Sequence, residues 1–157
     1  MNTIIQRGSF TVRLAGTEYN LDDGTYDIFV SGCTRKCVGC FNPEVQNFAF
    51  GEEIDIDLII KKIQFNNSMI KAIRVMGGDL LCQDQREAEY FTSIMRGNFS
   101  DKPLILYTGA LIDDIPHWCY ELFDSIKYGP YIESLKCNDP RFGSSNQKII
   151  NKGVDYK

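Results

Sequence analysis

Short apolar runs typical of strands alternate along this chain with longer segments whose apolar residues recur at helical spacing. The strand-like runs occupy residues 26–30, 73–76, 104–107 and 125–128. The helical patterns lie between them, at residues 56–63, 83–96 and 115–123. Strands joined by single helices form right-handed βαβ units, so the pattern predicts a mainly parallel α/β sheet with helices on the outside. Four strands cannot close an eight-stranded barrel, and we expect a small partial (β/α) barrel with a curved, open sheet.

Local signals set the expected helix limits. Asp55 is placed to cap the first helix, and Pro116 is tolerated in the first turn of the third. Gly97 and Asn98 are expected to end the second helix.

The chain has the size and composition of one globular domain. It contains 157 residues, of which 43% are hydrophobic and 24% charged, and no linker or repeat divides it. We therefore expect residues 1–157 to form a single domain. The net charge is −4 and no cluster of Lys and Arg occurs, which gives no support for a nucleic-acid partner.

Export and membrane insertion are not indicated. Residues 1–7 lack the apolar core of a secretory signal, and no apolar run approaches the roughly 20 residues that span a bilayer. We expect a cytoplasmic protein without a membrane partner. Its six cysteines are then expected to be reduced, and clustered cysteines in a reducing compartment indicate metal or redox chemistry.

Unusual residues follow three of the predicted strands. A cysteine-rich loop follows residues 26–30, a Gly-Gly-Asp sequence follows 73–76, and Thr108 with Gly109 follows 104–107. In parallel α/β sheets the chemistry sits beyond the carboxyl ends of the strands. We therefore expect these three segments to form the functional site.

Cys33, Cys37 and Cys40 place three thiols within eight residues. Closed iron–sulfur sites and structural zinc sites use four protein ligands, so one position is left open. On a cubic [4Fe-4S] cluster, an iron without a protein ligand can bind a substrate. Arg35 and Lys36, inside the loop, would offset the negative charge of cluster and thiolates.

Two other interpretations of the cysteines remain open. Cys37 and Cys40 alone form a C-x2-C pair, which suits a thioredoxin-like redox site but leaves Cys33 unexplained. A zinc site would need a fourth ligand, and four side chains could supply it: His117, Cys82, Cys119 or Cys137.

The C-x3-C-x2-C spacing directly after a strand resembles the signature of the radical S-adenosylmethionine superfamily. Phe41 stands where that superfamily has an aromatic residue, and the Gly-Gly-Asp sequence at Gly77, Gly78 and Asp79 resembles its glycine–glycine–acid motif. Physically, glycines allow close backbone approach and a carboxylate can pair with an ammonium group.

Further motifs resemble the activating enzymes of anaerobic (class III) ribonucleotide reductases, over roughly residues 26–150. They are the sequences at residues 29–33, 37–42, 107–109, 129–131 and 143–147. The resemblance implies that S-adenosylmethionine is cleaved reductively at a [4Fe-4S] cluster. It also implies that the 5′-deoxyadenosyl radical generates a glycyl radical on the reductase, with a flavodoxin-like protein as electron donor.

The resemblance also implies roles for individual residues. The three cysteines would be the cluster ligands, and Phe41 would cover the adenine. Gly77, Gly78 and Asp79 would hold the methionyl ammonium, and Thr108 is a candidate for the cofactor pocket.

The chain departs from the family pattern at several positions. Leu80 stands where the family usually has proline, Tyr107 replaces a tryptophan, and Tyr128 replaces an acid. The glycine-rich lead-in to the first strand is reduced to Asp-Asp-Gly at residues 22–24, and Phe142 separates Arg141 from the following glycine. These departures affect recognition of the partner more than the assignment of cluster and cofactor.

Other reactive residues are given no site role. Cys82, Cys119 and Cys137 lack mutual ligand spacing, so core packing is expected for them, and His117 is expected on the surface or hydrogen-bonded in the core. Residues 143–147 could bind cofactor or partner, or form a turn.

Two rival functions follow from the open alternatives. One is a small zinc-stabilised binding module without catalysis. The other keeps the radical chemistry but acts on a different substrate.

Overall fold

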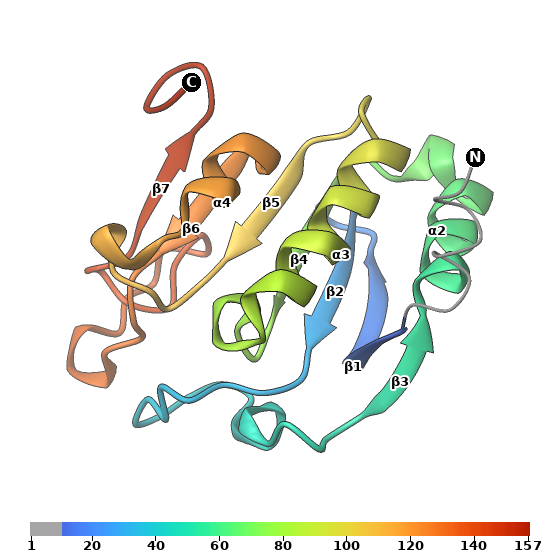
Figure 1. The fold of residues 1–157 in the computed structure, drawn as a ribbon. Coiled ribbons are helices and arrows are strands. Elements are labelled where there is room, and N and C mark those ends of the chain that lie inside the picture. The colour runs from blue at the N-terminus through green and yellow to red at the C-terminus, as the bar shows by residue number, and fades with distance from the viewer. Residues whose placement is uncertain (1–10) are drawn as a thin grey trace.

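A seven-stranded sheet forms the framework of the protein in a computed structural model that describes residues 11–157 (Figure 1). The strand order across the sheet is β3-β1-β2-β4-β5-β6-β7. The strands are β1 (Thr11–Asn20), β2 (Thr25–Val30), β3 (Glu52–Asp55), β4 (Ala72–Gly77), β5 (Leu104–Tyr107), β6 (Ser125–Tyr128) and β7 (Lys148–Asn151).

The centre of the sheet is parallel, as the alternating pattern predicts. The four predicted strands are β2, β4, β5 and β6, and they pair in parallel in that order. The three predicted helices are α2 (Ile56–Phe65), α3 (Gln85–Asn98) and α4 (His117–Leu122). Because the central strands run the same way, their carboxyl ends meet at one edge, the lower edge in Figure 1.

The periphery of the sheet differs from the prediction, because three antiparallel strands flank the parallel centre. β1 pairs with β2 and β3 on one side, and β7 pairs with β6 on the other. Among residues 11–157, β3 and β7 form the edges of the sheet, so the sheet is open and does not close into a barrel. β1 and β2 form a hairpin whose turn contains Gly24 at φ +70°, and this turn explains the Asp-Asp-Gly sequence that precedes β2.

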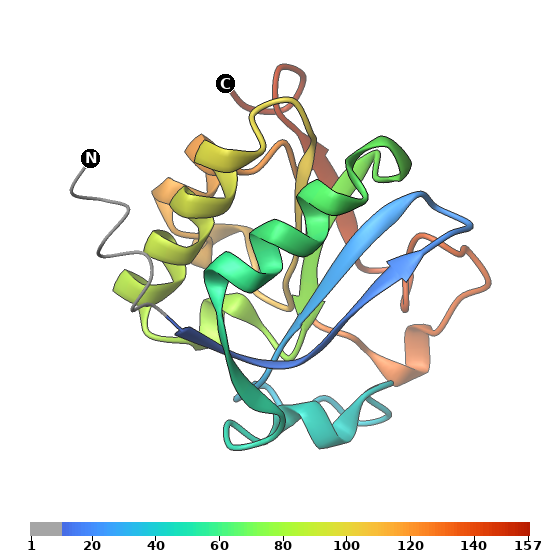
Figure 2. The same cartoon turned by 90° about the vertical axis from the view of Figure 1, so that its right-hand side faces the viewer.

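All three α-helices lie on one face of the sheet (Figures 1 and 2). Strand residues of alternating position, such as Ile28, Val75 and Leu106, are buried against them. In Figure 2 the segment between β6 and β7 lies on the opposite side of the sheet from α3. No α-helix of the described residues covers this opposite face, which leaves it available for a site.

Capping side chains fix the start of two helices. Asp55 accepts a hydrogen bond from the backbone N–H of Asp57 at 2.9 Å, which confirms the predicted cap of α2. Asp84 plays the same part for α3. α4 begins later than predicted, because Pro116 occupies its N-cap position instead of its first turn. α3 begins at Gln85 and continues through Gly97 to Asn98, so it is shifted by two residues from the predicted range 83–96.

None of the helices in residues 11–157 is long and apolar enough to cross a membrane. The expectation that residues 1–7 carry no secretory signal concerns residues outside the described part of the chain.

The packing of α3 generates the first prediction. Phe91 on α3 is 1% exposed, whereas Phe65 at the end of α2 is 89% exposed. Phe91→Ala should lower the free energy of unfolding by about 3–5 kcal/mol, because it leaves a cavity between α3 and the sheet. Urea unfolding followed by circular dichroism measures the change.

Phe65→Ala is the matched control and should change the free energy of unfolding by less than about 0.5 kcal/mol. Equal losses in the two variants would show that α3 does not pack as described.

Candidate functional site

A pocket opens beyond the carboxyl ends of the central strands, where the sequence places the site. The cysteine loop, the Gly-Gly-Asp segment and the segment after β5 all contribute to its wall, so the structure brings the three expected segments together. The described residues that line it are Phe29, Cys33, Arg35, Cys37, Cys40, Phe41, Asn42, Met76, Gly77, Gly78, Asp79, Tyr107, Thr108, Gly109, Lys127, Gly129, Tyr131 and Gln147.

Backbone hydrogen bonds hold the cysteine loop at the pocket. The backbone N–H groups of Gly32 and Cys33 donate to the carbonyls of Val45 and Gln46 at 2.7 and 3.0 Å. Further along, the N–H of Cys40 donates to the carbonyl of Cys37 at 3.2 Å and closes a turn. The loop is thus fixed at its first cysteine and folded back between the other two.

The three cysteines form a donor set that suits an iron–sulfur cluster. Cys33, Cys37 and Cys40 are each partly buried, and all three line the same pocket. Gly39 has φ +76°, a left-handed conformation that favours glycine between the last two cysteines. Soft thiolates on a short loop are the ligands that iron–sulfur clusters use, and the residues present therefore fit the group.

The glycines after β4 allow close contact with the cysteine loop. A side chain at Gly78 would overlap the backbone carbonyl of Gly32, and Gly77 has φ +102°. This approach lets the Asp79 N–H donate to the Gly32 carbonyl at 2.9 Å. The Gly-Gly sequence therefore joins the two segments that carry the cysteines and the acid.

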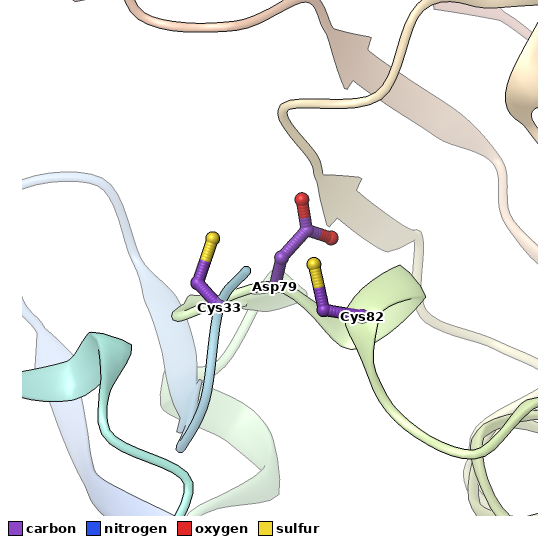
Figure 3. A group of neighbouring side chains, drawn as sticks. All are labelled: Cys33, Asp79 and Cys82. Atoms are coloured by element: carbon purple, nitrogen blue, oxygen red, sulfur yellow. The ribbon is translucent and has the colours of Figure 1, made fainter. Parts of the chain in front are cut away.

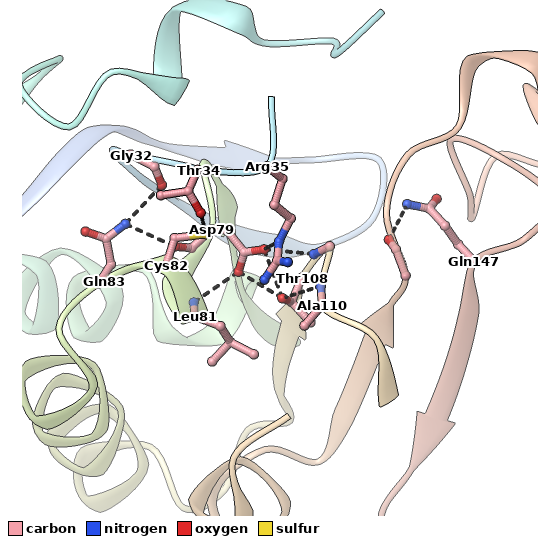
Figure 4. Close-up of polar contacts among 12 residues, drawn as sticks. Gly32, Thr34, Arg35, Asp79, Leu81, Cys82, Gln83, Thr108, Ala110 and Gln147 are labelled. Atoms are coloured by element: carbon pink, nitrogen blue, oxygen red, sulfur yellow. Dashed lines mark hydrogen bonds and ion pairs between the residues drawn. The ribbon is translucent and has the colours of Figure 1, made fainter. Parts of the chain in front are cut away.

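The buried carboxylate of Asp79 connects the three segments of the site (Figure 4). Asp79 is 2% exposed, and Arg35 of the cysteine loop donates to it through Nε at 2.8 Å. From the segment after β5, Thr108 Oγ1 donates at 2.9 Å and the Gly109 N–H at 2.8 Å. The Leu81 N–H completes the set at 3.0 Å. The charge of Asp79 is thus neutralised and its oxygens are fully hydrogen-bonded.

Arg35 therefore has a partner that the sequence analysis did not identify. It was expected to offset the charge of cluster and thiolates, but in the structure its guanidinium pairs with Asp79. The pairing spans 44 residues along the chain and depends on how the loops approach one another, so residue spacing carries no signal for it.

Phe41 and Thr108 both line the pocket, but they differ in exposure. Thr108 is buried and bonded to Asp79, whereas Phe41 is 62% exposed at the mouth. The ring of Phe41 lies 5.0 Å from that of Tyr131, between centroids. An exposed ring at the mouth, in contact with a second aromatic ring, can cover a flat ligand ring without rearrangement of the core.

Residues 143–147 hold the pocket wall that follows β6. Gln147 Nε2 donates to the Gly129 carbonyl at 3.1 Å (Figure 4), and Asn146 Nδ2 donates to the Pro130 carbonyl at 2.8 Å. Gln147 also accepts from the Gly143 N–H at 2.9 Å. These hydrogen bonds fix the position of residues 129–131, and Gln147 itself lines the pocket.

Charged residues on the helix-free face of the sheet were missed by the sequence analysis. Asp27 on β2 and Arg74 on β4 are paired in the sheet register and form a two-point ion pair at 2.7 and 2.6 Å. Lys127 on β6 places Nζ 4.4 Å from the ring centroid of Tyr107. The sequence did contain a signal for this charged face, because each of three apolar strands contains one charged residue. Neighbouring parallel strands bring such residues close together.

None of the ion pairs formed by residues 11–157 includes Lys127, so its ammonium has no carboxylate partner in this part of the chain. Burial lowers the pKa of Lys127, and the nearby charge of Arg74 lowers it further. The pocket therefore contains an ammonium group that is poorly compensated by the protein.

The remaining cysteines occupy three different environments. Cys119 is 0% exposed in the core, as expected. Cys137 and Cys82 are only partly buried, so core packing is wrong for these two. Cys82 lies beside Cys33, and the interaction between the two thiols lowers the pKa of Cys82 to about 6 and raises that of Cys33. His117 is exposed on α4 beside Glu121.

Comparison with known proteins places this site in a family. A family model described as a 4Fe-4S single cluster domain matches residues 24–150. The anaerobic ribonucleoside-triphosphate reductase-activating protein of Enterobacteria phage T4 is 29% identical over 125 residues, which cover 78% of this chain and 80% of that protein. The protein of the same name from Escherichia coli K12 is 27% identical over 132 residues, covering 78% and 84%. The Salmonella typhimurium protein is 28% identical over 133 residues, with the same coverage.

The hydroxyl of Thr108 generates the second prediction. It donates to Asp79 and accepts from the Ala110 N–H at 3.1 Å. Thr108→Val keeps the shape of the side chain but removes the hydrogen-bond partner of the Asp79 carboxylate and of the Ala110 N–H. The free energy of unfolding should therefore fall by about 2–3 kcal/mol. Thr108→Ser, which keeps the hydroxyl, should lose clearly less. Urea unfolding of the cluster-free chain measures both, and a Val variant as stable as wild type would contradict the role of Asp79 as a connector.

Lys127 generates the third prediction. Because burial disfavours its charged form, Lys127→Met should raise the free energy of unfolding at neutral pH. A lowered folded-state pKa means that the unfolded chain binds the proton better, so wild type gains stability as pH rises toward the ordinary lysine range. The advantage of the Met variant should therefore shrink with rising pH. A variant less stable than wild type at neutral pH would show that the Tyr107 ring compensates the charge.

Proposed function

Because this chain belongs to the family of 4Fe-4S single cluster domains, we propose that it is an activating enzyme of the radical S-adenosylmethionine type, which generates a glycyl radical on an anaerobic ribonucleotide reductase. The observation that carries the proposal is one pocket lined by three cysteines of a C-x3-C-x2-C loop and by the Gly-Gly-Asp segment. The names of the relatives supply the reductase as partner.

Cys33, Cys37 and Cys40 would hold the [4Fe-4S] cluster. They are the only cysteines among the described residues that line the pocket, and three ligands leave one iron open to S-adenosylmethionine. When bound, the cluster supplies the electron that splits S-adenosylmethionine into methionine and a 5′-deoxyadenosyl radical. A flavodoxin-like protein is the proposed source of this electron.

Gly77, Gly78 and Asp79 would hold the methionyl ammonium of S-adenosylmethionine. Asp79 is the one carboxylate among the described residues that line the pocket. Its oxygen toward the cysteine loop now accepts from Arg35, so an ammonium group bound there takes the place of this guanidinium. Arg35 is 27% exposed and has room to turn outward, while Thr108 and Gly109 keep the carboxylate in position.

Phe41 would cover the adenine. It stands at the mouth against Tyr131, and the Lys136 ammonium lies 5.9 Å from its ring centroid. An aromatic ring that is 62% exposed at the mouth offers surface for stacking against a flat base. Thr108 acts through Asp79 and is a positioning residue.

The surroundings of the pocket suit a protein substrate. Exposed apolar side chains lie on the cysteine loop and on the segment that contacts it, namely Val38, Phe41, Ile132 and Leu135. An apolar rim around a partly open pocket is typical of a surface that docks another protein. The glycine of the reductase would enter over this rim, because a backbone glycine can be reached only by a site that admits a peptide segment.

The direct test is production of 5′-deoxyadenosine. The chain is reconstituted anaerobically with iron and sulfide, reduced with dithionite and given S-adenosylmethionine, and the product is measured by chromatography. Wild type should form 5′-deoxyadenosine, and Cys37→Ser should reduce its rate by at least about 100-fold, because one cluster ligand is lost. Cys137→Ser, outside the pocket, is the matched control and should behave as wild type.

Two results would overturn the proposal. Wild type that binds a colourless metal and forms no 5′-deoxyadenosine would favour the zinc-stabilised binding module. Cleavage without transfer of the radical to an anaerobic reductase would favour a different substrate.

A further inference from the structure

A pair of thiols from two separate segments meets at the edge of the site. The Sγ atoms of Cys33 and Cys82 and a carboxylate oxygen of Asp79 lie within 4.8 Å of one another. Figure 3 shows both sulfur atoms directed to the same side, with the carboxylate next to them. Cys82 belongs to the short turn after Asp79, 49 residues beyond Cys33, and none of the site roles proposed above uses it.

Several hydrogen bonds fix the two segments against each other. The Gly32 carbonyl accepts from the Asp79 N–H at 2.9 Å and from Gln83 Nε2 at 3.0 Å. Thr34 Oγ1 lies 3.4 Å from the sulfur of Cys82. The residues on either side of each cysteine are therefore anchored, and the two thiols are held as neighbours by the fold itself.

This group is poorly suited to hold a separate metal ion. The oxygens of Asp79 are already occupied by Arg35, Thr108 and backbone N–H groups. Without this carboxylate, two thiols are left, short of the four ligands of a structural site. The chemistry that remains for two adjacent, partly exposed thiols is formation of a sulfur–sulfur bond.

We propose that Cys33 and Cys82 form a disulfide when no cluster occupies the loop, with a low-molecular-weight disulfide as oxidant. One cysteine, as thiolate, attacks the oxidant and forms a mixed disulfide, releasing one thiol. The second cysteine then attacks its neighbour's sulfur and releases the other thiol. The two cysteines lose two electrons and two protons, and the oxidant gains them as two thiols. For the bond to form, the sulfur atoms, which now lie within 4.8 Å of each other, have to approach to about 2.05 Å.

The bond would take Cys33 out of the donor set of the cluster. The oxidised chain therefore cannot load a cluster until a reductant opens the bond, and Cys33 is shielded from irreversible oxidation in the meantime. This consequence rests on the proposed function, because it treats Cys33 as a cluster ligand. The bond itself does not depend on any activity.

Cys37 and Cys40 are the alternative pair for the first disulfide. Their C-x2-C spacing is that of redox pairs, and both are as accessible as Cys33. The structure places Cys33 next to Cys82 instead, so the identity of the first disulfide distinguishes the two possibilities.

The experiment uses the full cluster-free chain, reduced and then equilibrated anaerobically with mixtures of oxidised and reduced glutathione. Free thiols are blocked with iodoacetamide, and the disulfide is mapped by peptide mass spectrometry. The linked peptides of Cys33 and Cys82 should appear at the least oxidising mixture that forms any disulfide. Iron uptake on later reconstitution without thiol reductant should fall at least fivefold and return after dithiothreitol.

Cys82→Ser should remove the linked peptides and preserve iron uptake at that mixture, whereas Cys137→Ser should leave both as in wild type. Circular dichroism checks that the variants fold, and Cys82→Ala replaces a Ser variant that does not. A first disulfide between Cys37 and Cys40, or a mixed disulfide that never resolves, would overturn the proposal. Linked Cys33 and Cys82 with unchanged iron uptake would confirm the bond and instead refute Cys33 as a cluster ligand.

Discussion

The buried carboxylate of Asp79 is the constraint on which the site depends. A charge that is 2% exposed is tolerated only because a cation and several N–H and O–H groups surround it. These partners come from the cysteine loop and from the segment after β5, so satisfying one carboxylate fixes the relative positions of three loops. Gly77 and Gly78 are needed for the same reason, because a side chain on either would hold the loops apart.

The open sheet determines how this site can be approached. The α-helices occupy one face (Figures 1 and 2). The pocket lies at the strand ends and includes Phe29, Met76 and Lys127, whose strand positions face the other side of the sheet. That face carries the Asp27–Arg74 ion pair and the poorly compensated Lys127. A closed barrel would bury these charges, whereas the open edges leave room for cofactor and partner. The surroundings of the pocket are thus charged on the sheet face and apolar at the rim formed by Val38, Phe41, Ile132 and Leu135.

Sequence periodicity was sufficient for the parallel centre of the fold and for the grouping of the site. β5 was predicted to the residue and α2 with its cap, because long apolar runs and a capping Asp are local signals. β1, β3 and β7 were missed. β3 and β7 are edge strands of four residues, and β1 mixes polar and apolar residues, so all three gain their stability from pairing with neighbours. Arg35 with Asp79, and Cys33 with Cys82, were missed because both contacts join segments more than 40 residues apart. Tertiary contacts of this kind leave no trace in local spacing.

Mössbauer spectroscopy of the ⁵⁷Fe-reconstituted chain, with and without S-adenosylmethionine, tests the central claim most directly. If three cysteines hold a four-iron cluster beside the Gly-Gly-Asp segment, adding S-adenosylmethionine should change the isomer shift of about one iron in four and leave the others unaltered. A spectrum in which all irons stay equivalent after the addition would mean that no iron of the cluster is open to S-adenosylmethionine. The account of the pocket as a cofactor site would then be wrong.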